Sequence, residues 1–185
     1  MIARTELVNI IFDAGYIYEQ SYDTLIMAVQ LADEINEYSL LTAHTCLVLA
    51  SKINEDDMYT TEMVKNDVDL DVIAKEWEIC QKLNFNLRRV NFINFLGLII
   101  DQQMILPEIF WDISRDICLN KEVMNMNPWT ILAGILLLYK HGKLKGVNNH
   151  QRRQFNLIMT DLADCYGVAR DDLIKAYISC VAVVD

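Results

Sequence analysis

The sequence predicts an all-α protein. Its 185 residues include only two prolines and six glycines, so long segments lack the residues that most often end a helix. Apolar residues recur at the i, i+3, i+4 and i+7 positions that form one face of an amphipathic helix. No segment shows the sustained apolar–polar alternation of a half-buried strand, so no sheet is expected.

Five helices are expected in the first half of the chain. They are predicted over residues 4–18, 22–35, 41–52, 60–65 and 70–83. The helix over residues 41–52 is apolar on nearly every face, which indicates that other helices surround it. Residues 84–89 are interpreted as a linker that ends this half.

Five more helices are expected after the linker. They are predicted over residues 91–103, from about Pro107, from Pro128, and over residues 148–166 and 170–184. Proline is tolerated in the first turn of a helix, which suits Pro107 and Pro128. In each half the third helix is the most hydrophobic, so the order of elements repeats although the two halves share little sequence.

Composition argues against nucleic-acid and membrane binding. The 16 Lys and Arg residues are outnumbered by 26 Asp and Glu residues, and the formal charge is −10, whereas phosphate binding needs clustered basic residues. The basic segment over residues 140–153 is interpreted as a solvated connection. The apolar windows are shorter than the ~20 residues that a membrane span needs, and no secretory signal is apparent at the N-terminus.

Neither a metal site nor another cofactor is expected. The five cysteines show no CxxC or zinc spacing, and the three histidines are scattered. An odd number of cysteines, together with the lack of an apparent secretory signal, favours reduced thiols in an intracellular protein. No P-loop, GxSxG sequence or Gly-rich phosphate loop is found, so neither an enzyme nor a small-molecule substrate is expected.

Two charged residues lie at the edges of apolar stripes. Lys52 follows Val48 and Leu49 on the third predicted helix, and Glu76 lies between Val72 and Ile79 on the fifth. Each charge could reach water or pair with a neighbouring side chain. Alternatively, the two charges could flank an apolar groove that binds a partner helix, and composition does not decide between these interpretations.

Four segments resemble motifs of the cyclin family. Residues 47–55, Leu-Val-Leu-Ala-Ser-Lys-Ile-Asn-Glu, resemble the LLASKxxE sequence of the cyclin box, and residues 22–33 resemble its ETLxLAVxxxD helix. Residues 75–87 resemble its MExxxLxxLxFDL helix, and residues 127–134 resemble the P-x-x-I-A-G start of the central helix in the second repeat. The motifs occur in the family's order and at its spacing.

The resemblance implies two tandem five-helix cyclin-box repeats and a regulatory function. The N-terminal cyclin box would cover residues 1–88, and a C-terminal cyclin-like repeat would cover residues 89–185. A cyclin is a non-catalytic subunit that binds and allosterically activates a cyclin-dependent serine/threonine kinase. That kinase would be the partner, in a heterodimer.

The resemblance also implies particular binding residues. Lys52 and Glu76 match a lysine and a glutamate that contact the regulatory C-helix of the kinase and its neighbouring strand. Five further residues match positions that line the hydrophobic pocket for that helix, although core packing is an alternative role: Leu49, Ile53, Cys80, Phe85 and Leu87. Glu55 matches an acidic position near the interface, where a solvated surface charge is the alternative.

Two features of the first helix can be compared with the family. Arg4 and Asp33 match a charge pair that joins the first helix to the second. Many cell-cycle cyclins also carry MRAILxxW in this helix, a shallow patch that docks Arg-x-Leu substrates. Here the patch is degenerate, because Ala3, Glu6 and Ile10 replace its methionine, isoleucine and tryptophan while Leu7 is kept. A charge in a site that works by apolar burial argues against substrate docking.

Two other classes of protein remain as alternatives. An adaptor that resembles transcription factor IIB would use the same double five-helix repeat to bind DNA and a TATA-binding protein, but it needs a basic surface that a charge of −10 does not favour. Salt-dependent DNA binding would distinguish it from a cyclin. An all-helical enzyme is disfavoured by the missing catalytic motifs.

Overall fold

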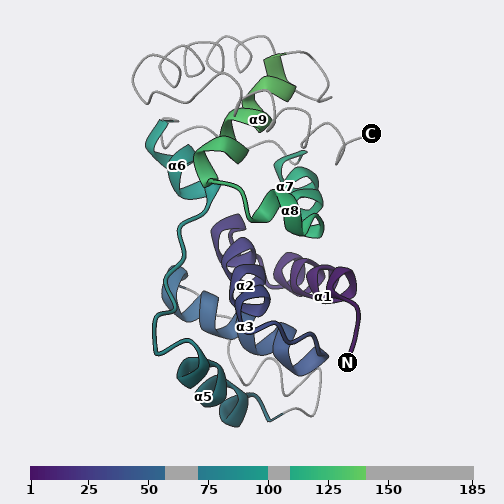
Figure 1. Ribbon diagram of the computed structural model, residues 1–185, viewed down its shortest axis with the longest axis vertical. Coiled ribbons are helices and arrows are strands. Elements are labelled where there is room, and N and C mark those ends of the chain that lie inside the picture. Colours follow the sequence, from purple (N-terminus) through teal and green to yellow (C-terminus); the bar gives the residue numbers. More distant parts are fainter. Residues whose placement is uncertain (57–70, 100–108, 141–185) are drawn as a thin grey trace. The chain divides into compact units, whose positions relative to one another are not determined.

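The computed structural model describes residues 1–56, 71–99 and 109–140, which form eight helices and no strand (Figure 1). The prediction of an all-α protein is confirmed for these residues. The chain divides into two compact units, Met1–Val90 and Asn91–Asp185.

Four described helices make up the first unit. They are α1 (Arg4–Ile17), α2 (Tyr22–Ile35), α3 (Leu40–Asn54) and α5 (Val72–Lys82). Local capping explains where three of them begin, because the side chains of Ser21, Ser39 and Asp71 accept hydrogen bonds from backbone N–H groups in the first turns of α2, α3 and α5. The predicted helix over residues 60–65 lies outside the described residues.

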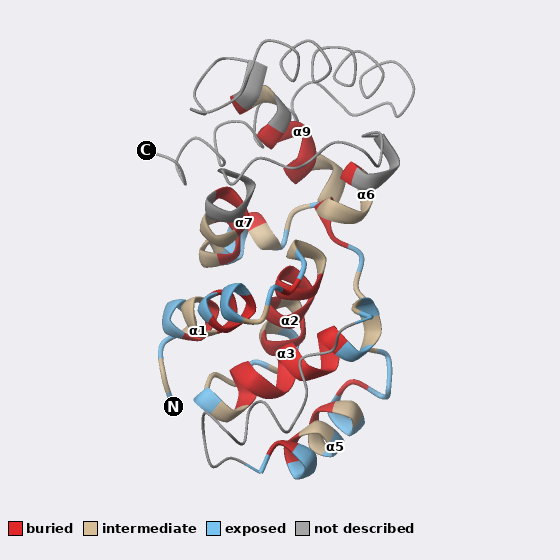
Figure 2. Cartoon of the chain, turned by 180° about the vertical axis from the view of Figure 1, so that it is seen from behind, coloured by how far each residue is buried: buried red, intermediate tan, exposed pale blue. Residues whose placement is uncertain are grey.

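Helix α3 is the centre of this unit. Every residue from Thr42 to Ser51 is buried, and α3 packs against α1, α2 and α5. Figure 2 shows α3 buried along most of its length, whereas α1 and α5 each have an exposed side. The sequence predicted this central position, because a helix that is apolar all round is stable only when other helices cover it.

Helices α1 and α2 approach each other closely at Gly15. A Cβ atom at this position would lie 2.1 Å from Cδ2 of Leu25, a side chain that is fully buried in α2. The close approach therefore depends on the missing side chain of glycine.

A salt bridge joins the start of α1 to the end of α2. Nε of Arg4 donates to Oδ1 of Asp33 at 2.7 Å, and the second guanidinium contact, to Oδ2, is 2.6 Å long. The hydroxyl of Tyr38 also donates to Asp33, at 3.1 Å. Only 13% of the Arg4 side chain and 15% of the Asp33 side chain are exposed, so solvent screens this pair weakly.

The second unit contains α6 (Phe92–Ile99), α7 (Ile109–Leu119), α8 (Lys121–Met124) and α9 (Pro128–Lys140) among its described residues. Helix α6 packs against α9, and Phe95 stacks on Trp129 with 4.0 Å between the ring centroids. Pro128 is the first residue of α9, as predicted. The predicted helices over residues 148–166 and 170–184 lie outside the described residues.

Helix α8 was missed by the sequence analysis. Its four residues are too few to show a helical period, and its start depends on Asn120, whose side chain accepts hydrogen bonds from the N–H groups of Glu122 and Val123.

Replacing Arg4 with alanine should destabilise the protein by about 2–3 kcal/mol, because it leaves a weakly exposed Asp33 carboxylate without its cation. Urea unfolding of the two proteins measures the difference. Arg88→Ala is the control, since this arginine is exposed, and it should change stability by less than about 0.5 kcal/mol. Equal effects of the two substitutions would contradict a structural role for the Arg4–Asp33 pair.

Candidate functional site

Helix α5 presents two different faces. Val72, Lys75 and Ile79 are buried on the inner face, which packs against α3. Ile73 and Trp77, one turn apart on the outer face, are 59% and 60% exposed. Apolar residues thus lie on both sides of the helix, but only the inner side is covered by the described part of the chain.

Phe85 extends the outer face beyond the end of the helix. Phe85 is 59% exposed, and its ring meets that of Trp77 edge to face, with 5.5 Å between centroids and 68° between planes. Cys80, half-buried, lies one turn after Trp77 on α5. We refer to Ile73, Trp77, Cys80 and Phe85 as the α5 surface. Single exposed apolar residues are common on proteins, but a cluster of them is typical of an interaction site.

The Lys52–Glu76 salt bridge borders the α5 surface. Nζ of Lys52, on α3, lies 2.5 Å from Oε1 of Glu76, on α5. Burial raises the pKa of the Cys80 thiol, and the Glu76 carboxylate raises it further, so the charge pair lies beside an un-ionised thiol. The sequence left open whether these two charges reach water, pair with a neighbouring side chain or flank a groove. In the free chain they pair with each other.

The two partners of this salt bridge differ in exposure. The Lys52 side chain is 41% exposed, whereas that of Glu76 is 15% exposed. A half-exposed ammonium group keeps donor capacity for a further contact, because it carries three protons. The pair is therefore intact in the free chain and still accessible from outside.

The remaining motif-matched residues of the first unit occupy different environments. Leu49 is buried at 6% exposure, and Ile53 and Leu87 are half-buried. Glu55 accepts hydrogen bonds from the backbone N–H and hydroxyl of Ser21, at 2.8 and 2.6 Å, and from the hydroxyl of Thr24. Its carboxylate thus fastens the end of α3 to the start of α2 and is not a freely solvated charge.

The degenerate patch on α1 offers little apolar surface. Ala3 and Glu6 are exposed and Ile10 is half-buried, while Leu7 is only 1% exposed. The leucine that the patch shares with docking cyclins therefore belongs to the core of the unit.

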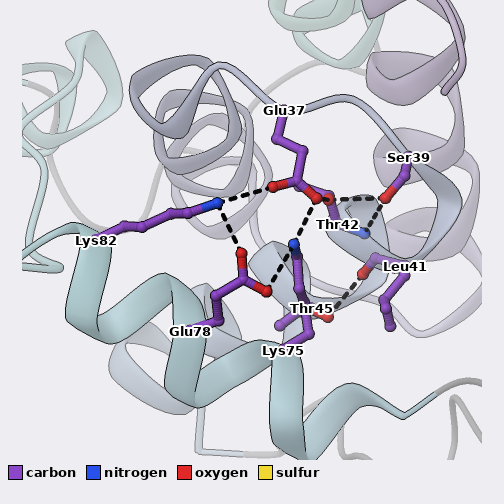
Figure 3. A network of polar contacts seen from close by, with 8 residues as sticks. All are labelled: Glu37, Ser39, Leu41, Thr42, Thr45, Lys75, Glu78 and Lys82. Carbon is purple, nitrogen blue, oxygen red and sulfur yellow. Dashed lines mark hydrogen bonds and ion pairs between the residues drawn. The ribbon is translucent and has the colours of Figure 1, made fainter.

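A four-charge network fastens the inner edge of α5 to the loop before α3 (Figure 3). Glu37 binds Nζ of Lys75 at 2.5 Å and Nζ of Lys82 at 3.0 Å. Glu78 completes the network, at 3.0 Å from Lys75 and 2.7 Å from Lys82. The sequence analysis missed it. The spacing of Lys75, Glu78 and Lys82 along α5 was a usable signal, but nothing local connected these residues to Glu37.

The network shifts the ionisation of its members. The hydrogen bond from Lys75 lowers the pKa of Glu37 to about 2, against burial, which raises it, and Lys82 adds to the lowering. Burial acts to lower the pKa of Lys75, but hydrogen bonds to Glu37 and Glu78 outweigh it, so the pKa is raised. Both groups are therefore charged at neutral pH and stabilise each other.

The turn after α5 has an unusual backbone. Asn84 and Phe85 both have positive φ angles, 50° and 57°. The N–H of Phe85 donates to the carbonyl of Cys80 at 2.7 Å, and that of Asn84 donates to Gln81 at 3.1 Å, which satisfies carbonyls at the helix end. Asparagine tolerates the left-handed region, whereas a bulky aromatic residue there is strained by roughly 1–2 kcal/mol.

The segment after this turn is not a free linker. Nε of Arg89 donates to Oε2 of Glu34 in α2 at 2.8 Å, and another guanidinium nitrogen donates to the carbonyl of Asn86 at 2.7 Å. The segment over residues 84–89 lacks helix, as predicted, but it is folded back on the first unit.

Comparison with known proteins identifies no matching family model, and no curated protein matches the chain. The relation to cyclins therefore remains a prediction from the sequence motifs. In the described ranges, no helix has the length and apolar character needed to cross a membrane. Within the same ranges, no three His, Cys, Asp or Glu side chains gather where they could hold a metal ion.

We expect Glu37→Gln to destabilise the protein by roughly 2 kcal/mol at neutral pH, because the glutamine does not neutralise Lys75 and Lys82. The pKa of Glu37 falls from 4.5 to about 2 on folding, so the carboxylate contributes fully above about pH 5. Its contribution is lost as the pH falls through about 2, where the difference between the two proteins should vanish.

Denaturant unfolding between pH 2 and 7 measures this difference. Glu6→Gln is the control, since Glu6 is exposed on α1, and it should change stability by less than about 0.5 kcal/mol throughout. A Glu37→Gln effect that does not depend on pH would show that the network does not act through charge.

Proposed function

We propose that this chain is a cyclin, a non-catalytic subunit that binds and activates a cyclin-dependent serine/threonine kinase. The proposal includes two tandem five-helix cyclin-box repeats, over residues 1–88 and 89–185, and a location in the nucleus, the cytoplasm or both. The observation that carries it is the juxtaposition of the Lys52–Glu76 pair and the α5 surface. Three elements contribute motif-matched residues to this region: α3, α5 and the turn that follows α5.

The region has the composition expected of a regulatory interface. Its centre is apolar and aromatic, and its margin carries a charge pair whose lysine is 41% exposed. Aromatic side chains supply apolar area at a low entropic cost, and a charge pair at the rim favours one orientation of the partner.

The proposed mechanism is allosteric. A free kinase populates an inactive position of its C-helix, and the cyclin binds the active position more tightly. The equilibrium then shifts by the difference between the two binding free energies. In the active position a Lys–Glu pair of the kinase aligns the phosphates of ATP, so the chemistry belongs to the partner.

Lys52→Ala and Glu76→Ala should each weaken kinase binding by about 2–5 kcal/mol, because removing one charge leaves polar groups of the interface unpaired. Glu76→Ala should change the free energy of unfolding by about 1 kcal/mol or less, since the Lys52 side chain left behind is 41% exposed, whereas Lys52→Ala leaves the 15%-exposed Glu76 carboxylate without its cation and should cost about 1–2 kcal/mol. Titration against a panel of purified cyclin-dependent kinases without their cyclins measures affinity, and phosphorylation of a serine peptide measures activation.

A charge swap separates the structural role of this pair from binding. The double variant Lys52→Glu with Glu76→Lys restores the internal salt bridge but reverses both charges toward the partner. It should unfold like the parent and still fail to activate the kinase. Arg4→Ala, which removes the salt bridge to Asp33 between α1 and α2, is the control for loss of an ion pair and should still activate the kinase. If the swap variant activates fully, Lys52 and Glu76 do not contact the kinase.

Arg-x-Leu peptides should bind weakly or not at all. Glu6 is exposed and Leu7 is buried at 1%, so the first helix lacks the apolar floor that such peptides need. Calorimetry with a synthetic peptide tests this, and Glu6→Ile is the informative variant. Micromolar binding by the parent would contradict the expectation.

A further inference from the structure

Trp77 is the most exposed aromatic residue of the α5 surface, and the cyclin motifs assign it no role. It is 60% exposed. Full burial of an aromatic side chain removes roughly 150–250 Å² from water, and much of this burial is not reached at Trp77. Within the described chain its ring forms an edge-to-face pair with Phe85. The pair therefore leaves most of the indole uncovered in the first unit.

The backbone holds this aromatic pair in place at a cost. Phe85 has a φ of 57°, in the left-handed region, and the residue is still 59% exposed. Strain that is not repaid by burial of the side chain is typical of a site organised for binding. The hydrogen bond from Phe85 to Cys80 and the Arg89–Glu34 salt bridge fix the turn on both sides.

We propose that Trp77, held against Phe85 by the left-handed turn, is the principal contact residue for the kinase, and that Ile73 extends the interface by one helical turn. This inference rests on the proposed function, because its occupant is the same partner. Ile73 and Trp77 have the i, i+4 spacing that presents a ridge to a facing helix. The partner surface is therefore an apolar helix face that covers both side chains.

A second copy of this chain is a poorer occupant. The chain carries a formal charge of −10, so two copies repel each other. Three exposed side chains also cover much less than the roughly 800 Å² per partner of a stable interface. A kinase that also contacts the Lys52–Glu76 margin uses a larger, continuous surface. The position of Trp77 between Glu76 and Cys80 provides that continuity.

The test compares three variants in the full chain. Trp77→Ala should weaken binding to the kinase that the parent activates by about 10- to 100-fold, as expected when a central tryptophan is truncated. Trp77→Phe retains an aromatic ring and should lose less affinity for the kinase. Ile17→Ala is the matched control, because Ile17 is an apolar residue on α1 with a similar exposure of 70%. It should bind and melt like the parent.

Fluorescence quenching provides a readout that a purely structural role would not change. Acrylamide quenches exposed tryptophans, and the difference between the parent and Trp77→Phe isolates the signal of Trp77. Adding the kinase should remove most of the acrylamide quenching that is due to Trp77.

The outcomes separate this inference from the proposed function. If no kinase of the panel binds the parent, the proposed function is wrong. If a kinase binds the parent and Trp77→Ala equally well, or leaves Trp77 open to acrylamide, the proposed function stands and this inference is wrong. Sedimentation that shows a dimer of the parent, dissociated by Trp77→Ala, would also overturn it in favour of self-association.

Discussion

The first unit depends on one constraint, which is that α3 must be covered on every side. Its residues from Thr42 to Ser51 are all buried, and leaving even a few of them in water would cost about 1.5–3 kcal/mol for each large side chain. Helices α1, α2 and α5 supply the cover. Because α5 uses Val72 and Ile79 for this purpose, its second apolar side is left exposed, and the α5 surface is a consequence of how α3 is covered.

Two sets of charges fix α5, and their exposure gives them different roles. The Lys75 side chain is 9% exposed and its charge is shared between Glu37 and Glu78, so it has little capacity for an outside contact. The Lys52 side chain is 41% exposed and pairs with the carboxylate of Glu76. The first set therefore acts as an internal fastening, whereas the second is suited to a partner as well.

The proposed function follows from this arrangement of one covered and one open side. Fastening by Glu37 fixes the rotation of α5, which determines that Trp77 is exposed and that Glu76 reaches Lys52 on α3. The strained turn at Phe85 adds an aromatic ring to the same surface. A rigid surface of this kind can bind one conformation of a partner more tightly than another, and that difference is what an allosteric activator requires.

The sequence by itself determined the described helices other than α8 and the central position of α3, because hydrophobic periodicity is a local property. It also singled out Lys52 and Glu76 as charges at apolar edges. Only the tertiary structure decided that these two pair, that Glu37 reaches Lys75 across 38 positions of the chain, and that Trp77 is uncovered. The physical reason is that α5 is apolar on two sides, and periodicity does not say which side a neighbouring helix will cover.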